Sequence, residues 1–549
     1  MNFDKFLFPI ENNPLFSRVY GYLDYIVLIC LNILTHYLFI GSFKFVSDDW
    51  VQVVYSDFNQ YSFLHLLFES QRPGQYILIK IAVDAFGSVA LWYHVLNFVL
   101  STILLLVVYI TAKSLFKLFF QNPAPCALLF AACFCLLFNK DQLYPWADLF
   151  YDNIAYILYF GSFYCYMQSR EKRSYFFLAW IFYAGAVFIY QIGAFLPIVY
   201  IFYDILQKRT FKQAIWFVLP PFAYMLIRIT DWFGFGWVYM NFNYNYLSAH
   251  FLTNFITNLV HDVITSIGVT VVNVVYGVLG LMNLTVPAVC LLIVLDVIIS
   301  WLICHYIANL LKKDPGYVSA GYKEQVTRFI IFCIIGAFFS YILISANGFV
   351  ESRYLIFVDF FLLLAFVLLL ISLIQKNMAI FAVIFMLCLL VNQGLYVNWV
   401  ISGNIQDSVN KDLAAHSGEI MGKPYFYVNA SDFSRVRPDI IFTVGPGFSL
   451  HRNQFSYQIY DPYLNSQGLS QSALVFMLTY GAHINLTSTK LIYGTTGNVF
   501  VSSENGTLTC QDSKTGIYYT VNPSDYYEGN SSNLLSDYTA ETGSDWLLR

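Results

Sequence analysis

Residues 23–50 read LDYIVLICLNILTHYLFIGSFKFVSDDW, a long apolar run that ends in two adjacent aspartates. A membrane-spanning helix needs about 20 mostly apolar residues, and the run from 23 to 45 meets that requirement. Asp48 and Asp49 follow it almost directly, so we expect them just outside the membrane. Adjacent carboxylates repel, so one of the two binds a proton more tightly, which suits a general base near neutral pH. The alternative is that the pair is only solvated or caps a helix.

The composition of the whole chain agrees with a membrane location. Of the 549 residues, 58% are hydrophobic and 11% are charged, whereas a soluble domain carries roughly 25% charged residues. We therefore predict a polytopic α-helical membrane protein. The net charge of -4 gives no reason to expect a nucleic-acid partner.

Further apolar runs bring the expected number of transmembrane helices to about eleven. The predicted spans are residues 23–45, 89–112, 124–138, 150–168, 174–190, 192–206, 213–227, 286–310, 329–346, 354–374 and 378–398. Residues 263–284 are ambiguous, because they lie in a predicted loop and yet are apolar enough to span.

The positions of lysine and arginine predict the orientation. With a cytoplasmic N-terminus, most of these residues fall in inner loops, as the positive-inside rule requires. The same orientation places Asp48 and Asp49 outside. It also makes four segments outer loops: 46–88, which is expected to contain short surface helices, 139–149, 228–285 and 347–353.

The composition changes near residue 400, where apolar runs shorten to strand length. This divides the chain into a membrane module, 1–399, and an outer α+β domain, 400–549, that ends in an acidic tail from residue 526. Within the outer domain, strands are expected at 424–428, 439–444 and 499–501, and the spacing of 470–480 favours a helix.

Few ionisable residues lie near the predicted outer face, so each is a functional candidate. The carboxylates there are Asp48, Asp49, Asp57, Glu69, Asp141, Asp148, Asp152, Asp231 and Glu351. Arg72, in the turn Gln71-Arg72-Pro73-Gly74, and Arg353, in Glu351-Ser352-Arg353-Tyr354, are placed to bind a phosphate group. The alternative for Arg353 is that it reaches lipid head groups and pairs with Glu351. The histidines and cysteines show no metal-ligand spacing, so we expect no metal and no cofactor.

These motifs in this order resemble a known family. Ser47-Asp48-Asp49-Trp50 after the first span, Arg72-Pro73 on a surface helix, and Tyr190-Gln191 at the outer end of a later span are similar to the GT-C integral-membrane glycosyltransferases. Within them, the pattern most resembles the serotype-converting O-antigen glucosyltransferases of bacteria and their phages. The resemblance covers roughly residues 20–400 and no motif of the C-terminal region.

The resemblance implies an inverting transfer of a sugar, glucose in the first instance, from a polyprenyl-phosphate carrier to a lipid-linked O-antigen glycan on the periplasmic side of the bacterial inner membrane. The general base would be Asp48 or Asp49, with Asp48 preferred. Arg72 and Arg353 would bind the donor phosphate. The substrate-binding candidates are Trp50, Tyr190, Gln191 and Glu351. Two other classes stay open: an O-antigen polymerase or ligase, and a transporter or flippase of lipid-linked sugars.

Overall fold

In the computed structural model, the described residues are 14–45, 49, 62–69, 72–87, 89–118, 120, 122–138, 143–230, 270–271, 273–312, 322–345, 352–415, and seven strands between 425 and 530. The predicted outer loops 46–88, 139–149, 228–285 and 347–353 are therefore described only in part. The predicted strand at 439–444 and most of the acidic tail lie outside the described residues.

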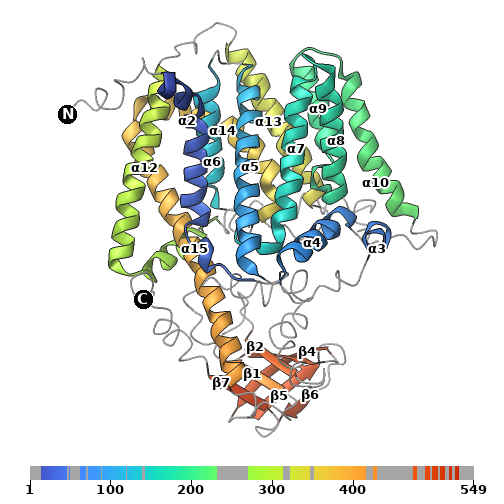
Figure 1. Ribbon diagram of the computed structural model, residues 1–549, viewed down its shortest axis with the longest axis vertical. Helices are drawn as coiled ribbons and strands as arrows, with labels where there is room; N and C mark the ends of the chain where they lie inside the picture. The colour runs from blue at the N-terminus through green and yellow to red at the C-terminus, as the bar shows by residue number, and fades with distance from the viewer. Residues whose placement is uncertain are drawn as a thin grey trace.

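The described part of the membrane module is a bundle of helices (Figure 1). Its helices are α2 (Pro14–Asn32), which continues into the π-helical turn η1 (Ile33–Tyr37), α3 (Phe63–Glu69), α4 (Pro73–Phe86), α5 (Ala90–Phe116), α6 (Ala124–Cys135), α7 (Phe150–Gln168), α8 (Arg173–Ile189), α9 (Leu196–Leu206), α10 (Leu219–Thr230), α12 (Val286–Lys312), α13 (Tyr322–Ser345), α14 (Ile356–Lys376) and α15 (Met378–Ala415). Each predicted span overlaps one of these helices.

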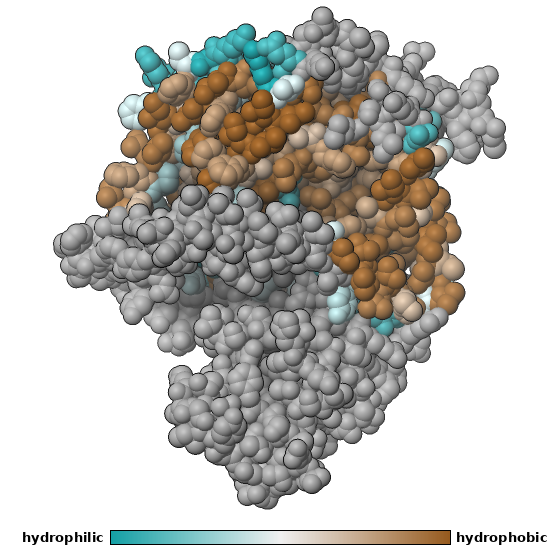
Figure 2. Space-filling model, turned by 180° about the vertical axis from the view of Figure 1, so that it is seen from behind, coloured by the Kyte–Doolittle hydropathy of each residue, from teal (hydrophilic) through white to brown (hydrophobic). Residues whose placement is uncertain are grey.

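Four segments of the described chain are long and apolar enough to cross a membrane: Tyr22–Ser42, Ala90–Phe116, Val286–Leu311 and Met378–Ile401. Figure 2 shows a broad hydrophobic surface on the described part of the bundle, with hydrophilic residues gathered at its upper edge. A surface of this kind is suited to lipid and not to water. The protein is therefore a helical membrane protein.

The two ends of the bundle differ in charge. One end, called here the basic end, carries Lys113, Lys117, Arg170, Lys172, Arg173, Lys208, Arg209, Lys212 and Arg328 in the short connections and helix ends. The opposite end, called here the site end, is where α3 and α4 lie across the bundle (Figure 1). The segment 46–88 thus contributes short helices at one end, as the sequence predicts.

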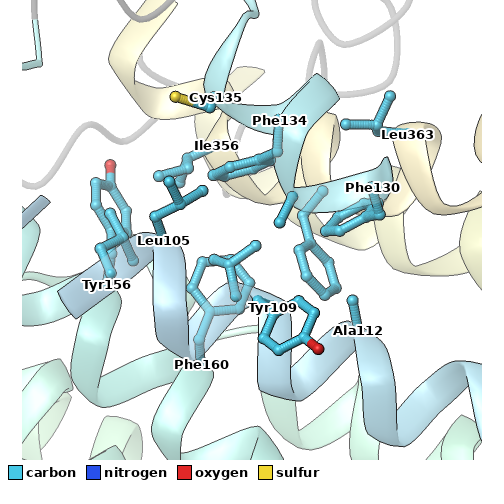
Figure 3. Packing of buried hydrophobic residues seen from close by; sticks show 14 of the residues in the cluster. Leu105, Tyr109, Ala112, Phe130, Phe134, Cys135, Tyr156, Phe160, Ile356 and Leu363 are labelled. Atoms are coloured by element: carbon cyan, nitrogen blue, oxygen red, sulfur yellow. The ribbon is translucent and has the colours of Figure 1, made fainter. Parts of the chain in front are cut away.

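Aromatic and aliphatic side chains pack together in the core between α5, α6, α7 and α14 (Figure 3). The Phe160 and Phe360 rings are 4.7 Å apart between centroids, and the Phe130 and Phe360 rings are 5.2 Å apart. These separations favour offset or edge-to-face contacts, which stabilise beyond simple burial. The core fixes the position of α7, whose first turn contributes to the candidate site.

One predicted span differs in its local structure. Residues 211–218 form the 3-10 helix η8, and the α-helix α10 begins only at Leu219. The cause is the pair Pro220 and Pro221, because proline lacks an N–H and is accommodated in the first turn of an α-helix and not further inside it.

In the ambiguous region, residues 273–282 are helical and cross α15 closely. A Cβ built on Gly394 would lie 1.9 Å from the carbonyl oxygen of Gly277, and one on Gly280 would lie 1.9 Å from the carbonyl oxygen of Gly394. Glycine on both helices permits this separation, as it does in many membrane helix pairs.

Beyond the end of α15, seven short strands form one sheet (Figure 1). They are β1 (Tyr425–Asn429), β2 (Leu474–Leu478), β3 (Thr489–Gly494), β4 (Gly497–Glu504), β5 (Thr507–Asp512), β6 (Tyr518–Val521) and β7 (Tyr526–Asn530), in the order β6-β5-β4-β3-β2-β1-β7. β1 is parallel to both β2 and β7, and the other neighbours are antiparallel.

Two details of the C-terminal region depart from the expectations. The helix expected at 470–480 is wrong, because residues 474–478 form β2; its apolar run LVFML pairs with strands on both sides, and such short runs do not distinguish a helix from a buried strand. The last helix also continues past residue 399 to Ala415, so the division of the chain near residue 400 falls inside a helix.

Candidate active site

The turn that carries Arg72 is packed against the end of α8. Pro73 occupies the first turn of α4, where its missing N–H costs no hydrogen bond, and Arg72 is the residue before the helix. A Cβ on Gly74 would lie 2.7 Å from the carbonyl oxygen of Phe188 and 2.8 Å from the Cα of Ile189. Only glycine permits this approach, which brings the start of α4 beside the last residues of α8.

This packing places Arg72 over the ring of Tyr190. The guanidinium carbon lies 5.1 Å from the ring centroid, and Nη1 donates a 3.3 Å hydrogen bond to Oε1 of Gln75. Burial alone lowers the pKa of Arg72, but interactions with three tyrosines and with Asp152 outweigh it and raise that pKa. The side chain therefore keeps its positive charge while half-buried among aromatic rings.

Tyr190 is itself held by the neighbouring helix. The Tyr159 hydroxyl donates a 2.5 Å hydrogen bond to the carbonyl oxygen of Tyr190, which ends α8. The Tyr190 ring lies 6.5 Å from the ring of Tyr151 and 6.2 Å from that of Tyr354. Arg72 thus lies beside three tyrosines from α7, the end of α8 and the short 3-10 helix η11 (Ser352–Leu355).

Asp49 caps a turn in the second predicted outer loop. Its carboxylate is fully buried, with Oδ1 accepting a 2.6 Å hydrogen bond from the backbone N–H of Asp148 and Oδ2 a 3.2 Å bond from that of Ala147. These two N–H groups belong to the 3-10 turn η6 (Ala147–Leu149) that leads into α7. A carboxylate at this position also complements the positive end of the helix dipole.

The same turn is held from its other side by Asn97 of α5. Its Nδ2 donates to the carbonyl oxygen of Trp146 at 2.8 Å and to that of Ala147 at 3.3 Å, and its Oδ1 accepts a 3.2 Å hydrogen bond from Asn153. Asp49 therefore accepts hydrogen bonds from the backbone N–H groups of this turn, and Asn97 donates to its backbone carbonyl groups. Together they fix the position of the start of α7.

Two further carboxylates lie where η6 leads into α7. Asp148 lies in the 3-10 turn η6 and Asp152 in the first turn of α7, and both are buried, with exposed fractions of 0% and 1%. Asp152 interacts electrostatically with Arg72 and with Tyr190. The acidic turn held by Asp49 and the arginine–tyrosine cluster are therefore adjacent parts of one site.

The structure brings together some of the predicted site residues. Arg72 and Tyr190 are in contact, and Asp49 supports the turn beside them. Gln191 is close in sequence, but its Nε2 donates to the carbonyl oxygen of Val187 at 3.1 Å, so the amide helps to end α8. Asp48, Trp50, Glu351 and the side chain of Arg353 lie outside the described residues, although the backbone of Arg353 is part of η11, next to Tyr354.

Other residues of the site have no role in the sequence-based prediction. Asn97, Tyr151 and Gln75 are not candidates there, and Asp148 and Asp152 are named only among the carboxylates. The available signal is the spacing of four residues between these two aspartates at the start of a span. Within the described ranges, no group of three or more His, Cys, Asp or Glu side chains is arranged to hold a metal ion.

The chemistry of this arrangement is that of an anion site with carboxylates at its edge. A half-buried arginine can bind phosphate through charge-assisted hydrogen bonds, and the tyrosine faces provide an apolar surface. Carboxylates can accept a proton from a hydroxyl group. Comparison of the chain with known protein families and with curated proteins finds no match.

Proposed function

We propose that the protein is a membrane glycosyltransferase that moves a sugar, with glucose as the first candidate, from a polyprenyl-phosphate carrier to a lipid-linked O-antigen glycan. The observation that carries this proposal is the adjacency of Arg72 and Tyr190 to the buried Asp152 at the start of α7, whose preceding turn Asp49 holds in place. A phosphate leaving group needs a cationic partner, and a hydroxyl nucleophile needs a carboxylate nearby, the role assigned below to Asp48, the sequence neighbour of Asp49.

In the proposed reaction, Arg72 binds the phosphate of the donor and stabilises the charge that develops as the bond between the sugar and the phosphate breaks. Asp48 accepts the proton of the acceptor hydroxyl, whose oxygen attacks the anomeric carbon from the opposite face and inverts it. The products are the new glycosidic bond and polyprenyl phosphate. Asp49 acts by positioning, because its carboxylate oxygens accept the two N–H groups of η6.

The orientation proposed for the chain follows from charge. With the basic end in the cytoplasm, the site end faces outside, and the bundle of about eleven spans leaves the C-terminal strands outside as well. Nucleotide sugars are not available there, so the donor would be carried by a lipid. For a bacterium, this means the inner membrane with the site on the periplasmic side.

The direct test is transfer by purified protein in lipid nanodiscs, given polyprenyl-phosphate glucose and a lipid-linked O-antigen acceptor, with the product identified by mass. We expect wild-type protein to transfer the sugar, and Arg72→Ala and Asp48→Asn to lose transfer. The matched controls are Arg328→Gln, an arginine at the basic end that is paired with Glu324, and Asp84→Asn, a half-exposed aspartate on α4.

The rival classes give different results in this assay. A polymerase or ligase would require a lipid diphosphate donor and would ignore the monophosphate. A flippase would move labelled lipid between leaflets without forming a glycosidic bond, and this activity would survive Asp48→Asn. Full transfer by both Asp48→Asn and Arg72→Ala would contradict the proposed roles of these residues.

A further inference from the structure

A carboxyl group lies inside the apolar part of the bundle, away from the candidate active site. Asp296 belongs to the apolar segment Val286–Leu311 of α12 and is fully buried. It faces Gln393, which belongs to the apolar segment Met378–Ile401 of α15 and is also fully buried. Ionisable residues within membrane helices are rare, and they mark functional positions by default.

In this pair, the side-chain amide donor of Gln393 is fully hydrogen-bonded, but one acceptor oxygen on each residue is not. Nε2 of Gln393 donates to Oδ1 of Asp296 at 3.0 Å and to the carbonyl oxygen of Leu34 in η1 at 3.3 Å. Among the described residues, no donor reaches Oδ2 of Asp296 or Oε1 of Gln393. Both oxygens are buried, so each would carry the cost of an unsatisfied acceptor.

The surroundings do not neutralise a negative charge on Asp296. No lysine, arginine or histidine of the described chain forms an ion pair with it. Among the described titratable groups on α12 and the elements around it, His36 in η1 interacts with Tyr396 and Cys135, and His305 and Tyr306 on α12 interact with Asn309 and with Asp24 of α2. The others carry no positive charge; they are Cys133 on α6, Cys304 on α12, Cys388 on α15 and Asp359 on α14. A buried carboxylate without a cation is strongly disfavoured and takes up a proton instead.

We propose that Asp296 is a proton-binding site within the membrane and that it carries its proton on Oδ2 when the bundle is assembled as in this structure. The acceptor for that proton is Oε1 of Gln393, because the same amide already contacts the carboxyl group through Nε2. One added hydrogen then satisfies both remaining acceptors. The result is a neutral acid–amide pair that joins α12 to α15 and, through Leu34, to η1.

This pair has a consequence for the packing of three elements. Loss of the proton would place a negative charge in an apolar environment. It would also leave Oδ2 of Asp296 and Oε1 of Gln393 as buried acceptors without a donor. The contact between α12, α15 and η1 would then weaken as a unit, since Gln393 bonds to both of the others. Protonation of Asp296 thus acts as a binding event that stabilises this part of the bundle.

Infrared difference spectroscopy of the full-length protein in nanodiscs tests the proposal. The carbonyl stretch of a protonated carboxyl group is separate from the amide bands, and the wild-type minus Asp296→Asn spectrum should contain one such band at neutral pH. In Gln393→Met the band should persist and shift to higher frequency, because the hydrogen bonds to the amide are lost. Asp84→Asn, which removes a half-exposed carboxylate, should remove no protonated band.

Thermal unfolding provides a second measurement. Asparagine at position 296 keeps the shape and neutrality of the protonated acid, so the melting temperature of this variant should depend less on pH than that of wild type as the pH rises from about 5 to about 9. The wild-type melting temperature should fall over the same interval, because a group that is protonated only in the folded state loses its contribution at high pH. If Asp296→Asn does not fold, the frequency shift of the band in Gln393→Met still tests the site, because only an acid bonded to this amide responds to the substitution.

Two results would overturn the proposal. The first is a wild-type spectrum whose protonated carboxyl band is the same in Asp296→Asn, since another acid would then carry the proton. The second is a sodium-dependent rise in the melting temperature of wild type, at constant pH and ionic strength, that Asp296→Asn lacks. That outcome would assign the oxygens of this pair to a metal cation.

Discussion

The guanidinium of Arg72 lies 5.1 Å from the centre of the Tyr190 ring, and this contact joins two motifs that are far apart in the sequence. Gly74 makes it possible, because the start of α4 can approach the backbone at the end of α8 only where no Cβ intervenes. Tyr159 then holds the carbonyl of Tyr190, so the ring is a fixed surface for the arginine.

Arg72 and Tyr190 should depend on each other in function. Cation–π contacts contribute roughly 0.5–2 kcal/mol, so Tyr190→Leu should lower kcat/KM by about 3- to 30-fold, as that free energy implies. Tyr190→Phe keeps the ring face and should change it by less. Arg72→Lys keeps the charge but loses the planar pair of donors. Steady-state kinetics with the polyprenyl-phosphate donor would measure these effects, and additive losses in the double variant would contradict the coupling.

Substitutions of Asp48 and Asp49 should have different effects, on transfer activity and on stability respectively. Asp49→Ala removes the acceptor of two buried backbone N–H groups, which costs about 1–3 kcal/mol for each group left unsatisfied, so unfolding should occur at lower temperature. Hydrogen exchange at residues 147–149 should become faster in the same variant. Asp48→Asn should abolish transfer and leave the melting temperature unchanged. A result in which Asp49→Ala unfolds like wild type would remove its positioning role.

Gly74→Ala should displace Arg72. The added methyl group would meet the Phe188 carbonyl oxygen and the backbone of Ile189, and overpacking of this kind costs typically 1–3 kcal/mol. Donor binding should weaken together with stability, as measured by KM and by the melting temperature. The control is Gly185→Ala on α8, where the new Cβ would lie 3.6 Å from a side-chain carbon of Leu158, an ordinary contact. Equal effects of the two substitutions would contradict the argument.

The sequence predicts the helices well and the site only in part. Spans are local features, since about 20 apolar residues in a row identify one without knowledge of the fold. Arg72 and Tyr190 can also be identified from local sequence, because Arg72 precedes a proline–glycine turn and Tyr190 lies at the end of a predicted span. The role of Asn97 does not, because an asparagine inside an apolar helix gives no sign that it will bond to the carbonyl of Trp146. Likewise, the sequence predicts that Asp49 is a functional acid, but it does not predict that Asp49 caps the distant turn at Ala147 and Asp148, because that contact depends on tertiary packing.

The crossing between helix 273–282 and α15 offers a test of the bundle itself. A Cβ on Gly394 would lie 1.9 Å from the Gly277 carbonyl oxygen, so alanine there requires the two helices to separate. The hydrogen bond from Nδ2 of Asn398 to the Tyr276 carbonyl oxygen, 2.9 Å long, would stretch as they do. We expect Gly394→Ala to lower stability by about 1–3 kcal/mol or more, measured by thermal unfolding in nanodiscs. Gly41→Ala, where a Cβ would meet nothing within 4 Å, should leave the melting temperature unchanged, and a stable Gly394→Ala protein would show that this crossing is looser than its geometry indicates.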